Sequence, residues 1–142
     1  TRTAWIGVNI FGMPLAADSA YHIQQHETGY DDDDVAMDGV YAESGFIDVA
    51  KGNEIPFVDQ FIPDIKWFGT GGSLNFTLWA VNYPSDDPQM YGPYTVTPSS
   101  QIVPARVRAR QIALRVDWAN TAGFSARLGA IMARISPAGR RP

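Results

Sequence analysis

The sequence predicts an all-β protein, either an antiparallel β-sandwich or a set of β-propeller-type blades with short strands and turns. Glycine (13) and proline (10) are frequent among its 142 residues, which is typical of short strands joined by turns. The clearest apolar patterns repeat every two residues, the period of a strand, and not at the helical period. Hydrophobic residues make up 45% of the chain, so there is enough apolar material for a core.

A chain of this length is expected to form a single β domain, residues 1–142. We divide it into an acidic N-terminal region of strands and turns, residues 1–52, and a main sheet region, residues 53–142, with arginine-rich C-terminal strands. No stretch approaches 18 apolar residues and the N-terminus has no signal-peptide pattern, so no membrane association is expected. The chain has no cysteine, which excludes disulfides, thiolate metal sites and a cysteine nucleophile.

Three strands are expected in the N-terminal region. The first covers residues 5–11, where aromatic and β-branched residues precede the turn Gly12-Met13-Pro14. The other two cover residues 21–26 and residues 40–49, each followed by turn-forming residues.

The next three strands are expected at residues 55–61, 74–81 and 94–97. One face of the first should carry every second side chain, namely Ile55, Phe57, Asp59 and Phe61. The second shows the clearest alternation, with Leu74 and Phe76 on the apolar face. The third is brief and lies between prolines, which favours the edge of a sheet.

The segment 105–116 is predicted to be one irregular strand. Val107 and Ala109 are apolar at odd positions, but after Gln111 the apolar residues are Ile112 and Leu114 at even positions. A single strand that keeps one face buried through this change needs an extra residue, so we expect a β-bulge near Arg110-Gln111.

The last segment, residues 128–135, fits both a helix and a strand. Its neighbours all have strand patterns, which favours a strand, and Ser136-Pro137 is expected to end it.

Charge is distributed unevenly along the chain. Residues 1–100 hold three basic and 14 acidic residues, a formal charge of −11, whereas residues 101–142 hold eight arginines and one acidic residue, a charge of +7. In this basic segment Arg106, Arg108 and Arg110 have the spacing that places side chains on one strand face. They and Arg115 are candidates to pair with carboxylates, to contact phosphates, or to form a solvated face.

Metal-binding patterns are weak. His22 and His26 lack the internal Glu of a zinc-protease helix, and in a strand they would lie about 13 Å apart, too far to share an ion. The run of four aspartates, together with Asp38, is a weak candidate for a Ca²⁺ site, because it lacks the Gly and the Glu of an EF-hand loop. These residues, expected to form a solvated turn, are Asp31, Asp32, Asp33, Asp34 and Asp38.

No arrangement of residues indicates catalysis. A glycosidase uses a pair of carboxylates, and two such pairs can be drawn here, Glu43 with Asp48 and Asp59 with Asp64. Any chain with 15 acidic residues contains such pairs, so they do not indicate a glycosidase. The glycine-rich segment 69–73 has neither the Lys of a P-loop nor dinucleotide-binding spacing. We expect a non-enzymatic protein with no cofactor, no metal and no small-molecule substrate.

Several blocks in order along the chain resemble the C-terminal part of a family of short-tailed bacteriophage tail hub, nozzle and packaged-DNA stabilisation proteins. The blocks are residues 2–6 (RTAWI), 12–15 (GMPL), 23–27 (IQQHE), 42–48 (AESGFID), 57–64 (FVDQFIPD), 107–116 (VRARQIALRV), 127–129 (RLG) and 137–141 (PAGRR). The family's proteins are several times longer, and they tend to carry Gly where this chain has Ala109.

The resemblance implies a β-rich virion structural protein, a subunit of a ring beneath the portal that lines or plugs the DNA exit channel. Its partners would be further copies of itself, other tail or portal proteins and packaged DNA, with non-specific contact to the DNA. It would be located in the virion and, during assembly, in the host cytoplasm.

The residues and the resemblance together predict self-assembly through complementary charges. We expect Arg106, Arg108, Arg110 and Arg115 to pair with carboxylates of the same chain or of a neighbour, or to face the DNA lumen. Aromatic residues would anchor the interfaces, with Trp67, Trp79 and Trp118 as candidates. The alternative is a β-sandwich carbohydrate-binding or receptor-recognition module in which these tryptophans stack on sugar rings.

Overall fold

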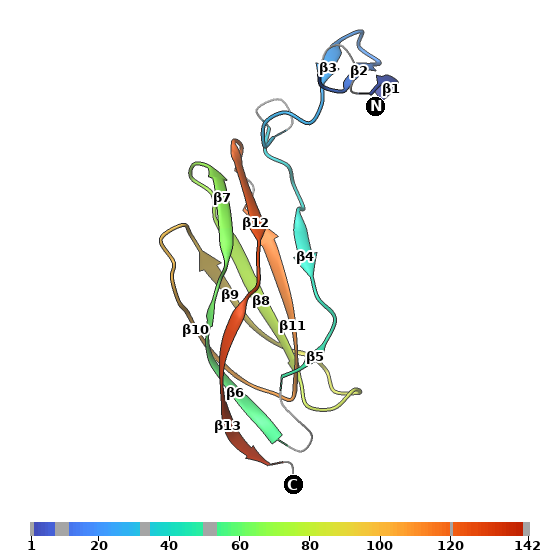
Figure 1. Cartoon of the computed structure of the whole chain (residues 1–142). Helices are drawn as coiled ribbons and strands as arrows, with labels where there is room; N and C mark the ends of the chain where they lie inside the picture. Colours follow the sequence, from blue (N-terminus) through green and yellow to red (C-terminus); the bar gives the residue numbers. More distant parts are fainter. Residues whose placement is uncertain (1, 8–11, 32–34, 50–53, 120, 141–142) are drawn as a thin grey trace. The chain divides into compact units, whose positions relative to one another are not determined.

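The computed structural model describes residues 2–7, 12–31, 35–49, 54–119 and 121–140. These residues form short and medium antiparallel strands, and no helix occurs among them (Figure 1). The predicted all-β class is therefore confirmed, and the larger part of the chain is of the β-sandwich type. Within the described ranges no helix is long and apolar enough to cross a bilayer.

The chain divides into two compact units, Thr1–Tyr30 and Asp31–Pro142, so the boundary lies inside the acidic N-terminal region. The first unit is a three-stranded antiparallel sheet in the order β1-β2-β3. Its strands are β1 (Arg2–Ile6), β2 (Leu15–Asp18) and β3 (Ile23–Gln25). Of its described residues, Pro14 and Ala16 are buried, so this sheet has almost no core of its own.

One layer of the second unit is a five-stranded sheet in the order β4-β11-β8-β9, with β5 also paired to β11. The strands are β4 (Tyr41–Glu43), β5 (Ile47–Asp48), β8 (Leu74–Val81), β9 (Gln89–Val96) and β11 (Gln111–Trp118). The central pair, β8 and β11, is in continuous antiparallel register from Leu74 opposite Trp118 to Val81 opposite Gln111.

The facing layer contains a three-stranded sheet in the order β10-β6-β13 and the pair β12-β7. Its strands are β6 (Glu54–Ile62), β7 (Ile65–Gly69), β10 (Val103–Arg108), β12 (Phe124–Leu128) and β13 (Met132–Arg140). Because β7 follows β6 and β12 precedes β13, the two pairs form one long ribbon, visible in front of β8 and β11 in Figure 1. Between the pairs, the Gly129 amide donates to the Asp64 carbonyl at 2.7 Å.

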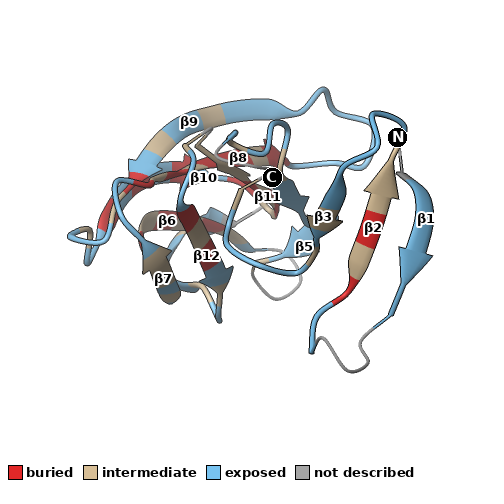
Figure 2. Ribbon diagram, turned by 90° about the horizontal axis from the view of Figure 1, so that it is seen from above, coloured by how far each residue is buried: buried red, intermediate tan, exposed pale blue. Residues whose placement is uncertain are grey.

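The core lies between the two layers. Phe76 of β8 is fully buried, and its ring stacks on Phe61 of β6 with 5.3 Å between ring centroids. Tyr94 of β9 meets Phe61 edge-on at 5.9 Å. Figure 2 shows buried segments in red on β8 and β12, one strand from each layer. Side chains from both layers thus fill one apolar interior.

The strand predicted at 74–81 is confirmed with the predicted bounds and inward face, since Leu74, Phe76, Leu78 and Ala80 are all buried. The predicted strand at 94–97 is the end of the longer β9, which lies at a sheet edge as expected. The predicted strand at 40–49 consists of two short strands, β4 and β5. The sequence reasoning did not find β2 or β7.

The prediction that Ile55, Phe57, Asp59 and Phe61 share one face of β6 is wrong. Pro56, Val58 and Phe61 are buried, whereas Phe57 and Asp59 are half-buried on the other face. The pairing with β13 shifts between Val58 and Gln60, so Asp59 has no opposite residue there. A strand irregularity of this kind reverses which positions face the core.

The single bulged strand predicted at 105–116 is also wrong. Residues 103–108 form β10 in one layer, residues 111–118 form β11 in the other, and Ala109-Arg110 connects them. The change from odd to even apolar positions marks the passage of the chain from one sheet to the facing sheet. Both sheets turn their apolar sides to the same core, so each strand keeps its own alternation.

The C-terminal segment has strand structure and no helix, as predicted, but residues 128–135 do not form one strand, because β12 ends at Leu128 and β13 begins at Met132. The expected end at Ser136-Pro137 is wrong, because β13 continues to Arg140 and Pro137 pairs with Pro56. As the order β10-β6-β13 places β13 at a sheet edge, a proline within it is tolerated. The predictions for residues 8–11 and for the turn-forming residues 51–53 after the strand at 40–49 lie outside the described residues.

Candidate functional site

Two of the predicted arginines stand side by side on the outward face of β10. Arg106 and Arg108 are exposed, while Val103, Ala105 and Val107 between and before them are buried. The alternation results from the strand period of two, with apolar side chains in the core and arginines in solvent. β10 lies at the edge of its own sheet and contacts β9 of the facing layer.

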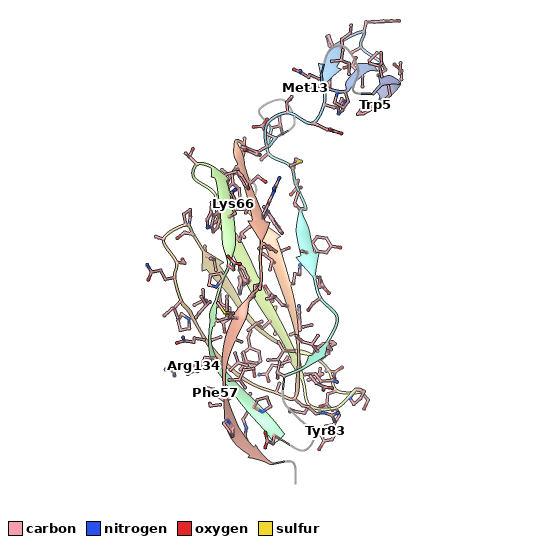
Figure 3. All side chains as sticks on the ribbon, in the orientation of Figure 1. Trp5, Met13, Phe57, Lys66, Tyr83 and Arg134 are labelled. Atoms are coloured by element: carbon pink, nitrogen blue, oxygen red, sulfur yellow. The ribbon has the colours of Figure 1, made fainter. Side chains whose placement is uncertain are left out.

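The same outward face continues across β6 and β13. Arg108 lies opposite Phe57, and Phe57 lies opposite Ser136. Arg134 of β13 donates from Nε to both carboxylate oxygens of Asp59, at 2.9 and 2.8 Å. Figure 3 shows Phe57 and Arg134 on the same side of the sandwich. We call the outward side chains of Arg106, Arg108, Arg134, Phe57 and Asp59 the arginine face.

The arginine face carries three guanidinium groups and one carboxylate. The hydrogen bonds from Arg134 lower the pKa of Asp59, and the same interaction raises the pKa of Arg134. Arg106 and Arg108 form no ion pair with any residue that the structure describes. The Asp59 charge is therefore matched by Arg134, and the two β10 arginines give the face its excess positive charge.

Gly139 shapes the far end of this face. A Cβ atom at Gly139 would lie 3.1 Å from Nη2 of Arg108. The Arg108 side chain therefore reaches across β6 to the backbone of β13, where the absence of a side chain leaves room for its guanidinium group. The N–H groups of a guanidinium can donate to an incoming carboxylate or phosphate.

The other two predicted arginines do not belong to the arginine face. Arg110 lies beyond the end of β10, with Nε 3.7 Å from Oδ1 of Asp48. Arg115 lies on β11, in the opposite layer. The four arginines of the prediction are thus divided between two layers and the connection between them.

Arg115 is fully engaged by its own chain. It donates from Nη2 to Asp117 at 2.8 Å and from Nη1 to Glu43 at 3.3 Å, and it stacks 4.1 Å over the Tyr41 ring. Hydrogen bonds to Asp117 and then to Glu43 raise the pKa of Arg115. Strand pairing brings these groups together, because Arg115 lies opposite Glu43 in the register of β11 and β4. Arg115 therefore belongs to an internal network. Unlike Arg106 and Arg108 of β10, it already binds two carboxylates of its own chain.

The three candidate tryptophans do not share one face. Trp67 of β7 packs against Phe124 with 5.7 Å between ring centroids, and Trp118 of β11 packs against the core. Trp79 lies on the outward side of β8, opposite Met90 and Ala113. All three are half-buried, so they do not form a row of exposed rings.

The histidines and the described aspartates of the N-terminal part have local partners. His22 Nδ1 lies 3.2 Å from the Asp18 carboxylate, and the His26 ring lies 4.8 Å from the Trp5 ring. A hydrogen bond from the His22 backbone amide is the main cause of the lowered pKa of Asp18.

Asp31 and Asp38 accept hydrogen bonds from the backbone, Asp31 from Gly123 at 3.0 Å and Asp38 from Gly39 at 2.8 Å. The Ca²⁺ candidates Asp32, Asp33 and Asp34 lie outside the described residues. Among the residues that are described, no three metal-ligating side chains come together.

Sequence reasoning missed Arg134 and the outward positions of Phe57 and Asp59. The charge excess of residues 101–142 included Arg134, but nothing local showed that β13 would lie beside β6. Comparison with known proteins finds no family model and no curated protein that matches this chain.

Proposed function

We propose that this chain is a non-enzymatic structural protein of a short-tailed phage virion. It would be a β-rich subunit of a hub, nozzle or adaptor ring that oligomerises around the DNA exit channel and contacts other tail or portal proteins. The observation that carries the proposal is the arginine face, where Arg106 and Arg108 are exposed beside Phe57 without a carboxylate partner in the described chain.

An assembly of identical copies gives these arginines suitable partners. A neighbouring copy presents carboxylates from the acidic residues 1–100, which carry a formal charge of −11. Guanidinium groups form paired, charge-assisted hydrogen bonds with carboxylates, and arginine and aromatic residues are enriched in protein interfaces. The resemblance of the sequence blocks to tail hub and nozzle proteins points to the same kind of assembly.

The alternative, a carbohydrate-binding module, has weaker support. It needs exposed aromatic rings on one sheet face, whereas Trp67 and Trp118 pack against other apolar residues. The sandwich-type fold is compatible with either function, because a fold does not specify one.

The test is charge reversal on β10. Arg106→Glu with Arg108→Glu should abolish assembly, because the reversed face would repel the acidic surface of a neighbour. Light scattering gives the mass in solution, and electron microscopy shows whether rings form. The wild type must first be shown to assemble under the conditions used.

Lys66→Glu with Arg127→Glu is the matched control. These residues lie opposite each other on β7 and β12, are exposed, and make the same change in net charge elsewhere in the same layer. We expect this variant to assemble normally. Normal assembly of the β10 variant, or equal loss in both variants, would contradict the proposal.

A further inference from the structure

The turn between β8 and β9 carries a pair of exposed carboxylates on the other side of the sandwich from the arginine face. Asp86 and Asp87 are adjacent, and both are exposed. From this arrangement we infer that the Asp86-Asp87 turn of one copy receives the arginine face of the next. This inference rests on the proposed function and identifies the partner surface.

The turn is held in a defined conformation. The Asp86 amide donates to the Tyr83 carbonyl at 3.1 Å, and the Tyr83 amide donates to Oδ2 of Asp86 at 2.9 Å. Pro84 and Pro88 flank the carboxylates and restrict the backbone further. A preorganised turn loses less conformational entropy on binding than a flexible loop does.

The charges of the two surfaces are equal in number and opposite in sign. Arg115, Arg110 and Arg134 already occupy carboxylates of their own chain, namely Glu43, Asp117, Asp48 and Asp59. Within the described residues, Asp86 and Asp87 form no ion pair. The two exposed guanidinium groups on β10 can bind two carboxylates of another copy. The turn presents two carboxylates next to each other.

The two surfaces lie on different layers of the sandwich, at the end where the Arg110 amide donates to the Asn82 side chain. Figure 3 shows Tyr83, which begins the turn, across the sandwich from Phe57 and Arg134. Each copy would then use one surface toward the next copy and the other toward the previous one. Such heterologous contacts generate a ring when the rotation between copies closes. Tyr83 is 38% exposed and adds an aromatic side chain beside the carboxylates.

A single charge reversal tests the turn without removing its backbone hydrogen bonds. Asp87→Arg leaves Asp86 and its bond to Tyr83 in place, and it should weaken assembly by about tenfold or more through like-charge repulsion. Asp38→Arg is the matched control, because it makes the same charge change at another exposed carboxylate of the second unit. Circular dichroism establishes that each variant is folded.

A mixing experiment identifies the partner directly. Arg106→Glu with Arg108→Glu keeps an intact turn, and Asp87→Arg keeps an intact arginine face, so neither variant should form rings alone. Mixed in equal amounts, they should regain assembly with one copy of each variant in alternation, because the intact turn of one variant meets the intact arginine face of the other and the two reversed surfaces also carry opposite charges. Light scattering and native mass spectrometry measure this stoichiometry.

The outcomes separate this inference from the proposed function. If the β10 variant loses assembly while Asp87→Arg assembles normally, the turn is not the partner, but assembly through the arginine face stands. If both assemble normally, both proposals are wrong. If the β10 variant assembles but loses salt-dependent DNA binding, the arginines contact phosphates, and that result also overturns the inference.

Discussion

The two compact units of this protein are both antiparallel β-sheets, but they differ in how much apolar surface they bury. In the sandwich, Phe76 is 0% exposed between two layers, whereas in the N-terminal sheet Trp5 is 57% and Ile23 77% exposed. The alternation of residues forms strands in both units. Burial requires a second layer, and only the sandwich supplies one from within its own unit.

This difference predicts where the stability of the folded chain resides. A small sheet without disulfides or a core gains little from folding alone, whereas a filled sandwich gains from every buried side chain. Substitutions in the sandwich core should therefore have large effects on its unfolding, and substitutions in the N-terminal sheet should have small ones.

The largest effect is expected from Phe76→Ala. Removal of this ring leaves a cavity beside Phe61 and should lower the free energy of unfolding of the sandwich by about 3–5 kcal/mol. Trp5→Ala, which removes a larger but exposed ring, should change it by less than about 0.5 kcal/mol. Urea denaturation monitored by circular dichroism measures both values, and similar losses in the two variants would refute the comparison.

An intermediate effect is expected at the glycine turn that precedes β8. Gly69 and Gly71 both have positive φ, 75° and 77°, so alanine strains the backbone by roughly 1–2 kcal/mol at either position. A Cβ at Gly69 would also meet the carbonyl of Gly123, whereas one at Gly71 has open space.

Gly69→Ala should therefore destabilise the sandwich by about 1–3 kcal/mol more than Gly71→Ala does. The difference between the two variants isolates the steric contact between the β7 and β12 ends, since the conformational strain is common to both. Thermal and urea unfolding provide the measurement. Equal losses would show that the backbone of the 123–124 turn moves aside.

The smallest effect is expected at the Arg134–Asp59 pair, which is partly exposed. Because Arg134 lowers the pKa of Asp59, the pair stabilises the fold when Asp59 is ionised, and this contribution is lost as the pH falls through the lowered pKa. Arg134→Gln should thus cost stability near neutral pH and cost nothing at a pH below that pKa.

Nuclear magnetic resonance titration of the carboxylates checks the cause. In Arg134→Gln the pKa of Asp59 should rise toward its ordinary value, while the pKa of Asp18 should stay low, because a backbone amide of its own unit lowers it. A stability loss that is the same at neutral and acid pH would mean that Arg134 acts through packing.

Local alternation was enough to predict some strands closely and misled the prediction for others. Residues 74–81 follow one uninterrupted period, and their bounds and inward face were predicted correctly. Phe57, Asp59 and Phe61 were wrongly predicted to share one face of β6, because the irregularity at Asp59 depends on pairing with β13, more than 70 residues away. At Arg110-Gln111, where a bulge was expected, the chain passes from one layer to the other. Both features produce the same change from odd to even apolar positions.

The candidate site shows the same division between local and distant information. The outward positions of Arg106 and Arg108 follow from the strand period alone, and the sequence indicated both. Asp117 lies two residues from Arg115 on the same strand, but Glu43, the second partner of Arg115, and Asp59, the partner of Arg134, lie 72 and 75 residues away. Sequence reasoning treated four arginines as equivalent, whereas the strand pairing divides them into engaged and unengaged groups.

The sequence by itself determined the all-β class, the strongest strands and the separation of acidic from basic residues, because these depend on neighbouring positions and on composition. Only the tertiary structure decided which charges neutralise one another and which face remains positive. An ion pair forms between side chains that strand pairing places within a few ångströms, and pairing between distant strands depends on the whole sheet, not on any local pattern.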